Sequence, residues 1–263
     1  MKILSLNTWQ ECGPWRERWE LIFQGLEECG PDIVAFQEIF NPDWVREIQK
    51  RSGIPYLVFP PEHSGLMVLS RFPVNRWMCL TMKTQSPTEN YFRYALFADL
   101  DILGTRLAIF NTHLSWKLNE SLIRVDQVEE LLGFIDAHAS GVETAVMGDF
   151  NATADTPEIR KMTREGNFID TYAFSNPQDP GITWNNRNPY TAGPNPPMPD
   201  RRIDYIFIRN RFRLLAGLES VRLVLNRPGK SGIWPSDHAA LLATFHTQGS
   251  VLKEKDRRRS RAA

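Results

Sequence analysis

The chain has 263 residues, 42% of them hydrophobic, and its 31 basic side chains balance 31 acidic ones. A chain of this length buries enough apolar surface to fold without a disulfide or a zinc ion. The zero formal charge argues against a general basic surface for nucleic acid or membrane, so such partners would need a local patch.

The amino-terminal part of the chain predicts two strand–helix pairs. Apolar and polar residues alternate over residues 1–9, and residues 32–40 contain a continuous apolar run typical of a buried strand, so we expect both to be strands. Residues 16–29 and 41–53 carry apolar side chains at helical spacing and end at glycine, so we expect helices there.

The next part of the chain predicts strands joined by short turns, a pattern suited to antiparallel pairing. The expected strands are residues 54–60, 65–71, 76–83, 93–102 and 106–114.

The clearest helix pattern covers residues 121–140, followed by a strand over 143–151 and a short helix over 156–166. The expected apolar face of the long helix consists of Leu122, Val125, Val128, Leu131, Leu132 and Ile135.

Residues 175–200 are rich in Pro, Asn and Gly and predict a long irregular loop, of a kind that is usually either functional or disordered. Strands are expected over 202–209, 212–225 and 238–246. This order predicts an α+β fold in which two packed, mostly antiparallel sheets carry helices on their outer faces. We expect residues 1–248 to form a single domain and residues 249–263 to form a basic, disordered tail.

Cys12, Cys29 and Cys79 are odd in number and fit no zinc-binding spacing, so we expect free thiols in a reducing compartment. The amino terminus shows no signal-peptide pattern. No apolar stretch reaches the ~18 residues that a transmembrane helix needs. We therefore expect a cytoplasmic location without a transmembrane segment, and no obligate protein partner is evident.

Short polar segments lie where predicted strands begin or end, positions that a scaffold holds rigidly. Taken singly, each has an ordinary explanation as a turn, a helix cap or a solvated side chain. Asp204 is the hardest to explain in that way, because a carboxylate inside an apolar strand needs a partner. The segments are residues 7–8, 37–38, 111–113, 148–151, 202–205 and 236–238.

Together these segments contain the groups needed for phosphoester hydrolysis. Hard oxygen ligands suit Mg²⁺ or Mn²⁺, and an imidazole beside a carboxylate is a competent acid or base. A metal ion neutralises phosphoryl charge while a carboxylate orients water for attack. The candidate groups are the carboxylates Glu38, Asp149, Asp204 and Asp237, the amides Asn7 and Asn151, and the imidazoles His113 and His238.

The motifs LSLNTW, FQEIF, NTHLSW, MGDFNAT, RRIDYIFI and SDHAAL, in this order, resemble the endonuclease/exonuclease/phosphatase superfamily, which includes DNase I. The resemblance spans residues 3–243 and implies a four-layer α/β/β/α sandwich. It implies that Glu38 is the main metal ligand with Asn7 beside it, and that Asp237 lies near the metal through water or at a second site.

The same resemblance implies roles for the remaining candidates. Asp149 would orient or deprotonate the attacking water, and Asn151 would bind a phosphoryl oxygen. Asp204 would fix the tautomer of His238, which would contact the scissile phosphate. His113 would lie near the leaving group, as a general acid or as a phosphate contact.

Several departures separate this chain from individual branches of the superfamily. AP endonucleases place a tyrosine near the position of His113 and an aspartate where this chain has Trp9. The inositol 5-phosphatases extend the GDxN motif differently. The chain looks closer to sphingomyelinase-like and uncharacterised bacterial members, although secreted sphingomyelinases carry a signal peptide.

Two arginines and several loop side chains are further candidates for substrate binding. Arg71 and Arg93 could each clamp a phosphate, or could pack their stems on the surface. The loop residues could stack a base or hold a head group, or could simply anchor their loops. They are Trp116, Trp184, Asn186 and Trp234.

The sequence therefore predicts a hydrolase dependent on Mg²⁺ or Mn²⁺, most simply a phosphodiesterase. The substrate stays open between nucleic acid, a lipid head group and a small phosphodiester. Alternatives are a nuclease, a phosphomonoesterase acting on a small metabolite, and an inactive phosphate-binding module.

Overall fold

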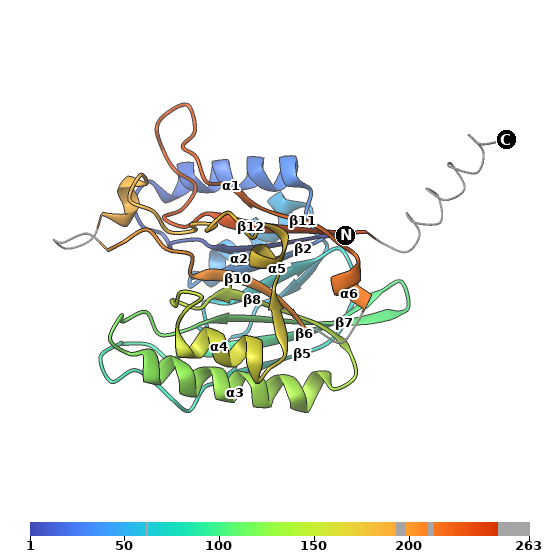
Figure 1. Cartoon of the computed structure of the whole chain (residues 1–263). Helices are drawn as coiled ribbons and strands as arrows, with labels where there is room; N and C mark the ends of the chain where they lie inside the picture. Colours follow the sequence, from blue (N-terminus) through green and yellow to red (C-terminus); the bar gives the residue numbers. More distant parts are fainter. Residues whose placement is uncertain (62, 193–197, 210–212, 247–263) are drawn as a thin grey trace.

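Two six-stranded sheets stack face to face in the computed structural model, which describes residues 1–61, 63–192, 198–209 and 213–246 (Figure 1). In spatial order, the first sheet consists of β11 (Leu218–Val224), β12 (Ala240–Phe245), β1 (Lys2–Asn7), β2 (Ile33–Gln37), β4 (Met67–Ser70) and β3 (Tyr56–Val58). The second consists of β5 (Val74–Thr81), β6 (Tyr94–Ile102), β7 (Thr105–His113), β8 (Glu143–Asp149), β10 (Asp204–Arg209) and β9 (Phe168–Asp170).

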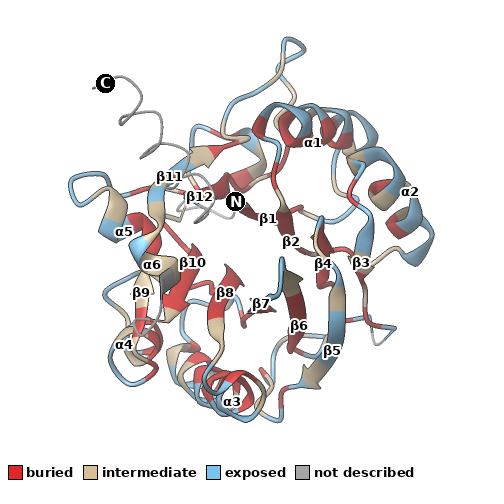
Figure 2. Ribbon diagram, turned by 90° about the vertical axis from the view of Figure 1, so that its right-hand side faces the viewer, coloured by how far each residue is buried: buried red, intermediate tan, exposed pale blue. Residues whose placement is uncertain are grey.

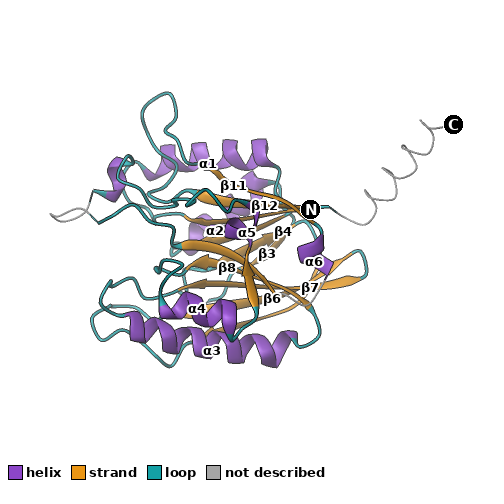
Figure 3. Ribbon diagram, in the orientation of Figure 1, coloured by secondary structure: helices purple, strands orange, loops and turns teal. Residues whose placement is uncertain are grey.

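Helices cover the outer faces of both sheets (Figure 3). The first sheet is covered by α1 (Trp15–Cys29) and α2 (Pro42–Ser52), and the second by α3 (Ser121–Ala139) and α4 (Pro157–Arg164). The remaining helical segments are α5 (Thr171–Ser175), α6 (Arg213–Ala216) and the 3-10 turn η1 (Pro189–Thr191). The four layers confirm the predicted α/β/β/α sandwich.

Each sheet contains one parallel pair, β1 with β2 and β7 with β8, and its other neighbouring strands are antiparallel. Both parallel pairs are joined through a helix, α1 in the first sheet and α3 in the second, as a parallel connection requires. The mostly antiparallel character predicted from the sequence is therefore confirmed.

Residues of the central strands alternate between two apolar layers, which explains why these strands are buried along most of their length (Figure 2). On β1, Ile3 lies in the core between the sheets, whereas Leu4 and Leu6 lie under the outer helices with Trp19 of α1. Burial on both faces fixes the register, because a one-residue slip would exchange the two sets of side chains.

The local signals at the ends of α2 work as the sequence predicts. The side chain of Asn41 accepts a hydrogen bond from the Asp43 amide at 3.0 Å, and Pro42 occupies the first turn. At the other end Gly53 adopts a left-handed conformation with φ of 65°, which a glycine accepts at little cost.

The predicted apolar face of α3 is wrong at its first turn. Leu122 is 79% exposed, while Arg124 and Gln127 are buried. At this end the helix packs against the polar loop that follows β7, so the inward positions carry hydrogen-bonding side chains. Farther along, Leu131 and Ile135 are fully buried as expected.

Three further segments differ from the sequence prediction. The strand expected over 212–225 begins only at Leu218, because α6 forms a short helical turn that ends with the Gly217 amide on the Leu214 carbonyl. The short elements β9 and α5 were not predicted, and η1 lies within the loop expected over 175–200. The predicted basic tail lies outside the described residues.

No helix among the described residues is long and apolar enough to cross a membrane.

Candidate active site

The pairing register brings the polar strand ends to one edge of the sandwich. In the first sheet Asn7 pairs with Gln37, directly before Glu38, at the ends of two parallel strands. In the second sheet Asp149 pairs with His113 on one side and with Asp204 on the other. Segments far apart in sequence therefore meet because the parallel strand pairs end, and the antiparallel strands β10 and β12 begin, at the same edge.

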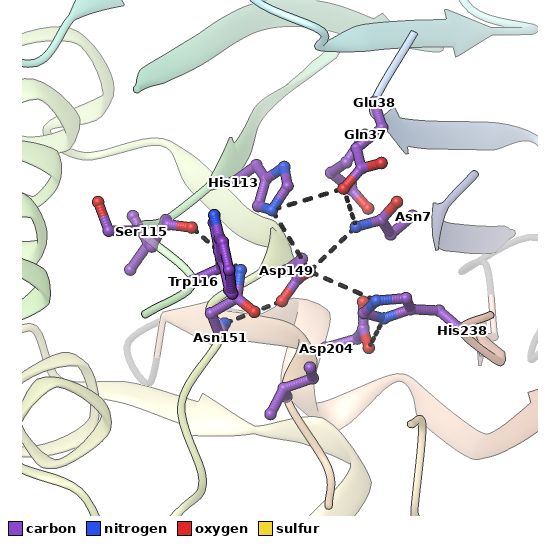
Figure 4. Close-up of polar contacts among 12 residues, drawn as sticks. Asn7, Gln37, Glu38, His113, Ser115, Trp116, Asp149, Asn151, Asp204 and His238 are labelled. Carbon is purple, nitrogen blue, oxygen red and sulfur yellow. Dashed lines mark hydrogen bonds and ion pairs between the residues drawn. The ribbon is translucent and has the colours of Figure 1, made fainter. Parts of the chain in front are cut away.

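The side chain of Asn7 links the two sheets. Its Nδ2 donates to Glu38 Oε1 and to Asp149 Oδ2, both at 3.0 Å (Figure 4). Its Oδ1 accepts the Trp9 amide at 3.0 Å, and its carbonyl accepts the Ser236 hydroxyl at 2.7 Å. Asn7 is thus held from four sides with its amide at the centre of the cluster.

Asp149 is the common neighbour of both histidines. Its Oδ2 lies 3.5 Å from His113 Nε2 and 3.7 Å from His238 Nε2, and its Oδ1 accepts the Asn151 amide at 2.8 Å. Burial and the nearby Asp204 raise the pKa of Asp149 to about 7, with the His238 ring opposing the shift. A carboxyl group with this pKa can take up a proton near neutral pH.

His238 and Asp204 form a buried pair. The Nδ1 of His238 lies 2.8 Å from Asp204 Oδ2, which directs Nε2 of the ring toward Asp149. Burial by itself lowers the pKa of His238, but Asp204, followed by Asp237 and Asp149, outweighs burial and raises the pKa well above its ordinary value. The ring therefore favours the charged imidazolium.

His113 behaves in the opposite way. Burial lowers its pKa well below the ordinary value, and the positive charges of Arg93 and His238 add to this effect. The two imidazoles that face Asp149 thus differ in charge, His113 neutral and His238 positive. Such a separation of two titratable groups is typical of acid–base sites.

Backbone strain is concentrated at the same edge. Glu38 and Asn151 have positive φ values of 65° and 50°, which are uncommon for residues other than glycine. A Cβ on Gly148, next to Asp149, would lie 1.9 Å from the Thr112 carbonyl oxygen. Only glycine therefore allows β8 to approach β7 closely enough to place Asp149 beside His113.

The donor atoms present suit a divalent cation. Glu38 and Asp237 lie at the more open side of the cluster, each with 14% of its side chain exposed. Burial raises the pKa of Asp237 to about 6, with His238 opposing and Glu38 reinforcing the shift. The two carboxylates repel one another and form an oxygen-rich corner in which a hard cation would be stabilised, while the neighbouring Asn7 amide presents its Nδ2 to Glu38.

A second grouping, Asp149, Asp204 and His238, has one ligand atom from each residue within 4.8 Å of the others. Its His238–Asp204 contact has the length of a charge-assisted hydrogen bond. This group therefore has the geometry of an acid–base pair with a neighbouring carboxylate, whereas the carboxylates of Glu38 and Asp237 lie at the more open side of the cluster.

The two arginines proposed from the sequence lie in different places. Arg71 follows β4, whose Ser70 pairs with Ile33 at the opposite end of β2 from Glu38, and its Nε donates to the Pro31 carbonyl at 3.2 Å. The structure therefore does not bring Arg71 to the site. Arg93 is buried near His113, and its Nη2 lies 2.6 Å from Glu89.

The aromatic candidates are also divided. Trp116 follows Ser115 in the loop after β7 and is 41% exposed, with the Lys117 ammonium 3.9 Å from its ring (Figure 4). Trp184 is only 9% exposed, and its ring packs under Arg201. Trp234 is half-buried before the Ser236 segment.

Asn186 is exposed but is used to hold its own loop. Its Nδ2 donates to the Met198 carbonyl at 2.7 Å and to Asp200 Oδ1 at 2.9 Å. These contacts are of the loop-anchoring kind that the sequence left open.

Sequence reasoning missed Arg18, a buried residue of α1. Its five N–H groups donate to backbone carbonyls at 2.8–3.0 Å, on Thr8, Trp9, Gln10, Cys12 and Pro235. These carbonyls flank Asn7 and Asp237, so Arg18 positions two segments of the site. An arginine next to Trp19 on the inward face of the helix was the available signal.

A sequence model described as the Endonuclease/Exonuclease/phosphatase family matches residues 7–238. The chain is 24% identical over 259 residues to tyrosyl-DNA phosphodiesterase 2 of Gallus gallus, an alignment covering 92% of this chain and 66% of that protein. The chain therefore spans about two thirds of the length of this relative.

Solved structures show the same fold at low sequence identity. D. rerio TDP2 complexed with a single-strand DNA product matches with a TM-score of 0.78 and 20% identity, over 94% of this chain and 99% of that one. The human Nocturnin catalytic domain with bound sulfate gives 0.72 and 21%, over 94% of each chain.

The beta toxin of Staphylococcus aureus gives a TM-score of 0.74 and 18% identity, over 94% of this chain and 100% of that one. The family match and the shared fold confirm the superfamily, the fold class and the general class of phosphoester hydrolase predicted from the sequence.

Proposed function

Because the chain belongs to the Endonuclease/Exonuclease/phosphatase family, we propose that its strand-end cluster hydrolyses phosphodiesters with the help of Mg²⁺ or Mn²⁺. One observation carries this proposal: a single buried carboxylate, Asp149, contacts the Asn7 amide and faces two imidazoles of opposite charge preference. Such an arrangement can activate a water molecule next to a group that stabilises negative charge.

In the proposed reaction, Asp149 Oδ2 accepts a proton from a water molecule whose oxygen attacks phosphorus. The bond from phosphorus to the leaving oxygen breaks, and that oxygen leaves with the bonding electrons. The side-chain amide of Asn7 and the backbone amide of Asn151 hold Asp149 in place for this step. The raised pKa of the Asp149 carboxyl makes proton uptake favourable near neutral pH.

His238, as imidazolium, stabilises the negative charge that develops on the phosphoryl oxygens. Asp204 holds the ring by its Nδ1 and leaves Nε2 for the substrate. His113 lies on the other side of Asp149, where it contacts the leaving group. The proposed role of Asn151 is to bind a phosphoryl oxygen. Its side chain donates to the Leu114 carbonyl at 3.0 Å, so the loop after β7 fixes where this side chain lies.

A divalent cation bound by Asn7, Glu38 and Asp237 would neutralise charge on the phosphoryl and leaving oxygens. The oxygen donors of this corner fit a hard ion.

Steady-state hydrolysis of bis-p-nitrophenyl phosphate tests the proposal. With Mg²⁺ or Mn²⁺ the protein should turn over, and EDTA should abolish turnover. Asp149→Asn should lower kcat by about 1,000-fold or more, whereas Asp155→Asn, at an exposed site on the following loop, should keep it within about twofold. Absent turnover would instead support a phosphate-binding module, and metal-independent turnover would contradict the proposed role of the cation.

We further propose that the natural substrate is a nucleic acid rather than a lipid head group. The name of the Gallus gallus relative and the single-strand DNA product bound to D. rerio TDP2 support this choice. The exposed ring of Trp116 beside the site can stack on a base. Parallel assays on single-stranded DNA, RNA, sphingomyelin and sugar phosphates with Mg²⁺ test it, and preference for sphingomyelin would refute it.

We also propose that residues 1–248 form one domain that works in the cytoplasm. Packing of both sheets around one shared core supports the single unit. Limited proteolysis should leave this region intact, and cleavage between the two sheets into separately stable pieces would contradict it.

A further inference from the structure

The backbone of Trp184 lies between the backbones of Arg201 and His238. Trp184 forms antiparallel bridges with both residues, and its amide and carbonyl exchange hydrogen bonds of 3.0 and 2.9 Å with Arg201. Directly opposed residues of an antiparallel pair project their side chains to the same face. Arg201 therefore shares a face with His238, whose ring points into the site.

The guanidinium of Arg201 is held but not neutralised. It lies 4.7 Å from the centre of the Trp184 ring, and its Nη2 lies 3.0 Å from Met198 Sδ. Its Nε is buried without a hydrogen-bond partner, and no carboxylate among the described residues is within 4.0 Å of it. A buried cationic donor without an anion is costly, so the position favours an anionic ligand.

The buried arginines near the site either face a carboxylate or use all their donors, although Nη1 and Nη2 of Arg93 make no hydrogen bond. Arg93 pairs with Glu89, Arg124 pairs with Glu158, and Arg202 pairs with Asp170. Arg18 has no carboxylate partner but uses all five of its donors on carbonyls. Arg201 thus differs from these four because no carboxylate neutralises its charge and its Nε makes no hydrogen bond.

The position of Arg201 indicates which anion it would bind. Its backbone is two inter-strand spacings, about 10 Å, from that of His238. The two side chains therefore start from well-separated backbone positions, an offset that suits contacts with two neighbouring phosphates of one substrate. Burial lowers the pKa of Arg201 and Asp149 opposes the shift, so the guanidinium is within electrostatic reach of the site.

We propose that Arg201 and the supporting ring of Trp184 form a subsite for a second phosphate of the substrate, adjacent to the phosphate that is hydrolysed. This inference rests on the proposed phosphodiesterase function and narrows its substrate to esters with at least two phosphates. The second phosphate could be internucleotide or terminal, since both present the same oxygens to a guanidinium.

Three p-nitrophenyl esters separate these possibilities. The first, of thymidine 5′-phosphate, carries only the scissile phosphate. The second, of a thymidine dinucleotide, adds an internucleotide phosphate, and the third, of thymidine 3′,5′-bisphosphate, adds a terminal one. Wild-type protein is compared with Arg201→Met, Arg201→Lys and the control Arg187→Met, which changes an exposed arginine of the same loop.

Arg201→Met should lower kcat/KM about 10- to 100-fold on an ester with a second phosphate and less than about threefold on the single-phosphate ester. Arg201→Lys should recover part of this loss because it keeps the charge without the planar fork. Loss confined to the dinucleotide identifies an internucleotide phosphate, and loss on the bisphosphate identifies a terminal one. Equal losses on all three esters, or no loss, would overturn the proposal.

Calorimetric titration with the unesterified dinucleotide 5′-phosphate separates failure of the subsite from failure of the proposed function. If wild-type protein hydrolyses none of the esters, the phosphodiesterase proposal fails. The subsite is still supported if Arg201→Met weakens binding at least about tenfold while Arg187→Met does not. Equal binding by all variants refutes the subsite whatever the activity.

Discussion

The two halves of the sandwich each send one buried arginine from an outer helix to the edge of the site, and the two are satisfied differently. Arg18 of α1 donates only to backbone carbonyls. Arg124 of α3 donates to the carbonyls of Ser115 and Lys117 and also pairs with Glu158 at 2.7 Å.

This difference matches the chemistry that each half contributes. The first sheet supplies the acidic corner of Glu38 and Asp237, and the unneutralised charge of Arg18 lies close to it. Burial lowers the pKa of Arg18, and the nearby Asp237 acts against this shift. On the second sheet the charge of Arg124 is cancelled by its own partner, so this arginine serves mainly to fasten the loop after His113.

Replacing the proposed metal ligand of the first half should have the largest effect. Glu38→Gln should lower kcat by at least about 1,000-fold and weaken activation by Mg²⁺, because the amide provides no charge to balance the cation. Titration of activity with Mg²⁺ measures both effects. Glu17→Gln, at an exposed site of α1, is the control, and activity within a few-fold of wild type for Glu38→Gln would show that the cation is held elsewhere.

The second largest effect is expected from removing the imidazole of His238, which extends from the first sheet to Asp204 of the second. His238→Ala should lower kcat about 100- to 1,000-fold with little change in metal affinity. Kinetics at several Mg²⁺ concentrations separate the two quantities, with His246→Ala, at a half-exposed site, as the control. A large loss of metal affinity would instead make His238 a ligand.

Breaking the ion pair of the second half should affect folding more than chemistry. Arg124→Ala leaves Glu158 buried without a cationic partner, with only the Ser121 hydroxyl donating to it, and should lower the free energy of unfolding by about 3 kcal/mol or more. Urea denaturation measures this, and replacing both residues with apolar ones of similar size should recover much of the loss. If the double variant is no more stable than Arg124→Ala, the unpaired charge is not the cause.

The corresponding change in the first half should affect chemistry more than folding. Arg18→Lys keeps the charge but cannot reach five carbonyls, so the segments next to Asn7 and Asp237 should lose their alignment. We expect kcat to fall about tenfold with KM nearly unchanged. If Arg18→Lys loses stability but keeps the wild-type kcat, Arg18 serves folding in the same way as Arg124 and does not align the site.

The smallest effect is expected at the first turn of α3. Leu122→Ala should change the free energy of unfolding by less than about 0.5 kcal/mol, because this side chain is mostly exposed. Leu131→Ala, on the buried face of the same helix, should cost about 2–5 kcal/mol. Similar losses for both variants in urea denaturation would show that the first turn is buried in solution.

Much of the fold follows from local pattern. The helix stops at Gly30 and Gly53, the cap at Asn41 and the apolar strands are all present where the sequence predicts them. The segment at 213–216 was misread because a single helical turn and a strand look alike over four residues, and tertiary packing decides between them.

The candidate site was predictable as a set of residue types, but their individual contacts were not. Asn7, Asp149 and His238 meet as expected from the ordered motifs. Arg71 and Arg93 were equivalent in the sequence, yet only Arg93 lies near the site. A strand's direction and its pairing register decide which of its ends faces the site, and local periodicity carries no information on either.

The amino-acid sequence by itself determined the order of the main elements, the apolar character of the central strands and the polar groups at strand ends, because each depends on residues close together in the chain. Tertiary structure alone decided that Arg18 uses five carbonyls, that Trp184 is buried and that Arg201 stands beside it without an anion. These features depend on pairings between residues up to 217 positions apart, such as Arg18 with Pro235.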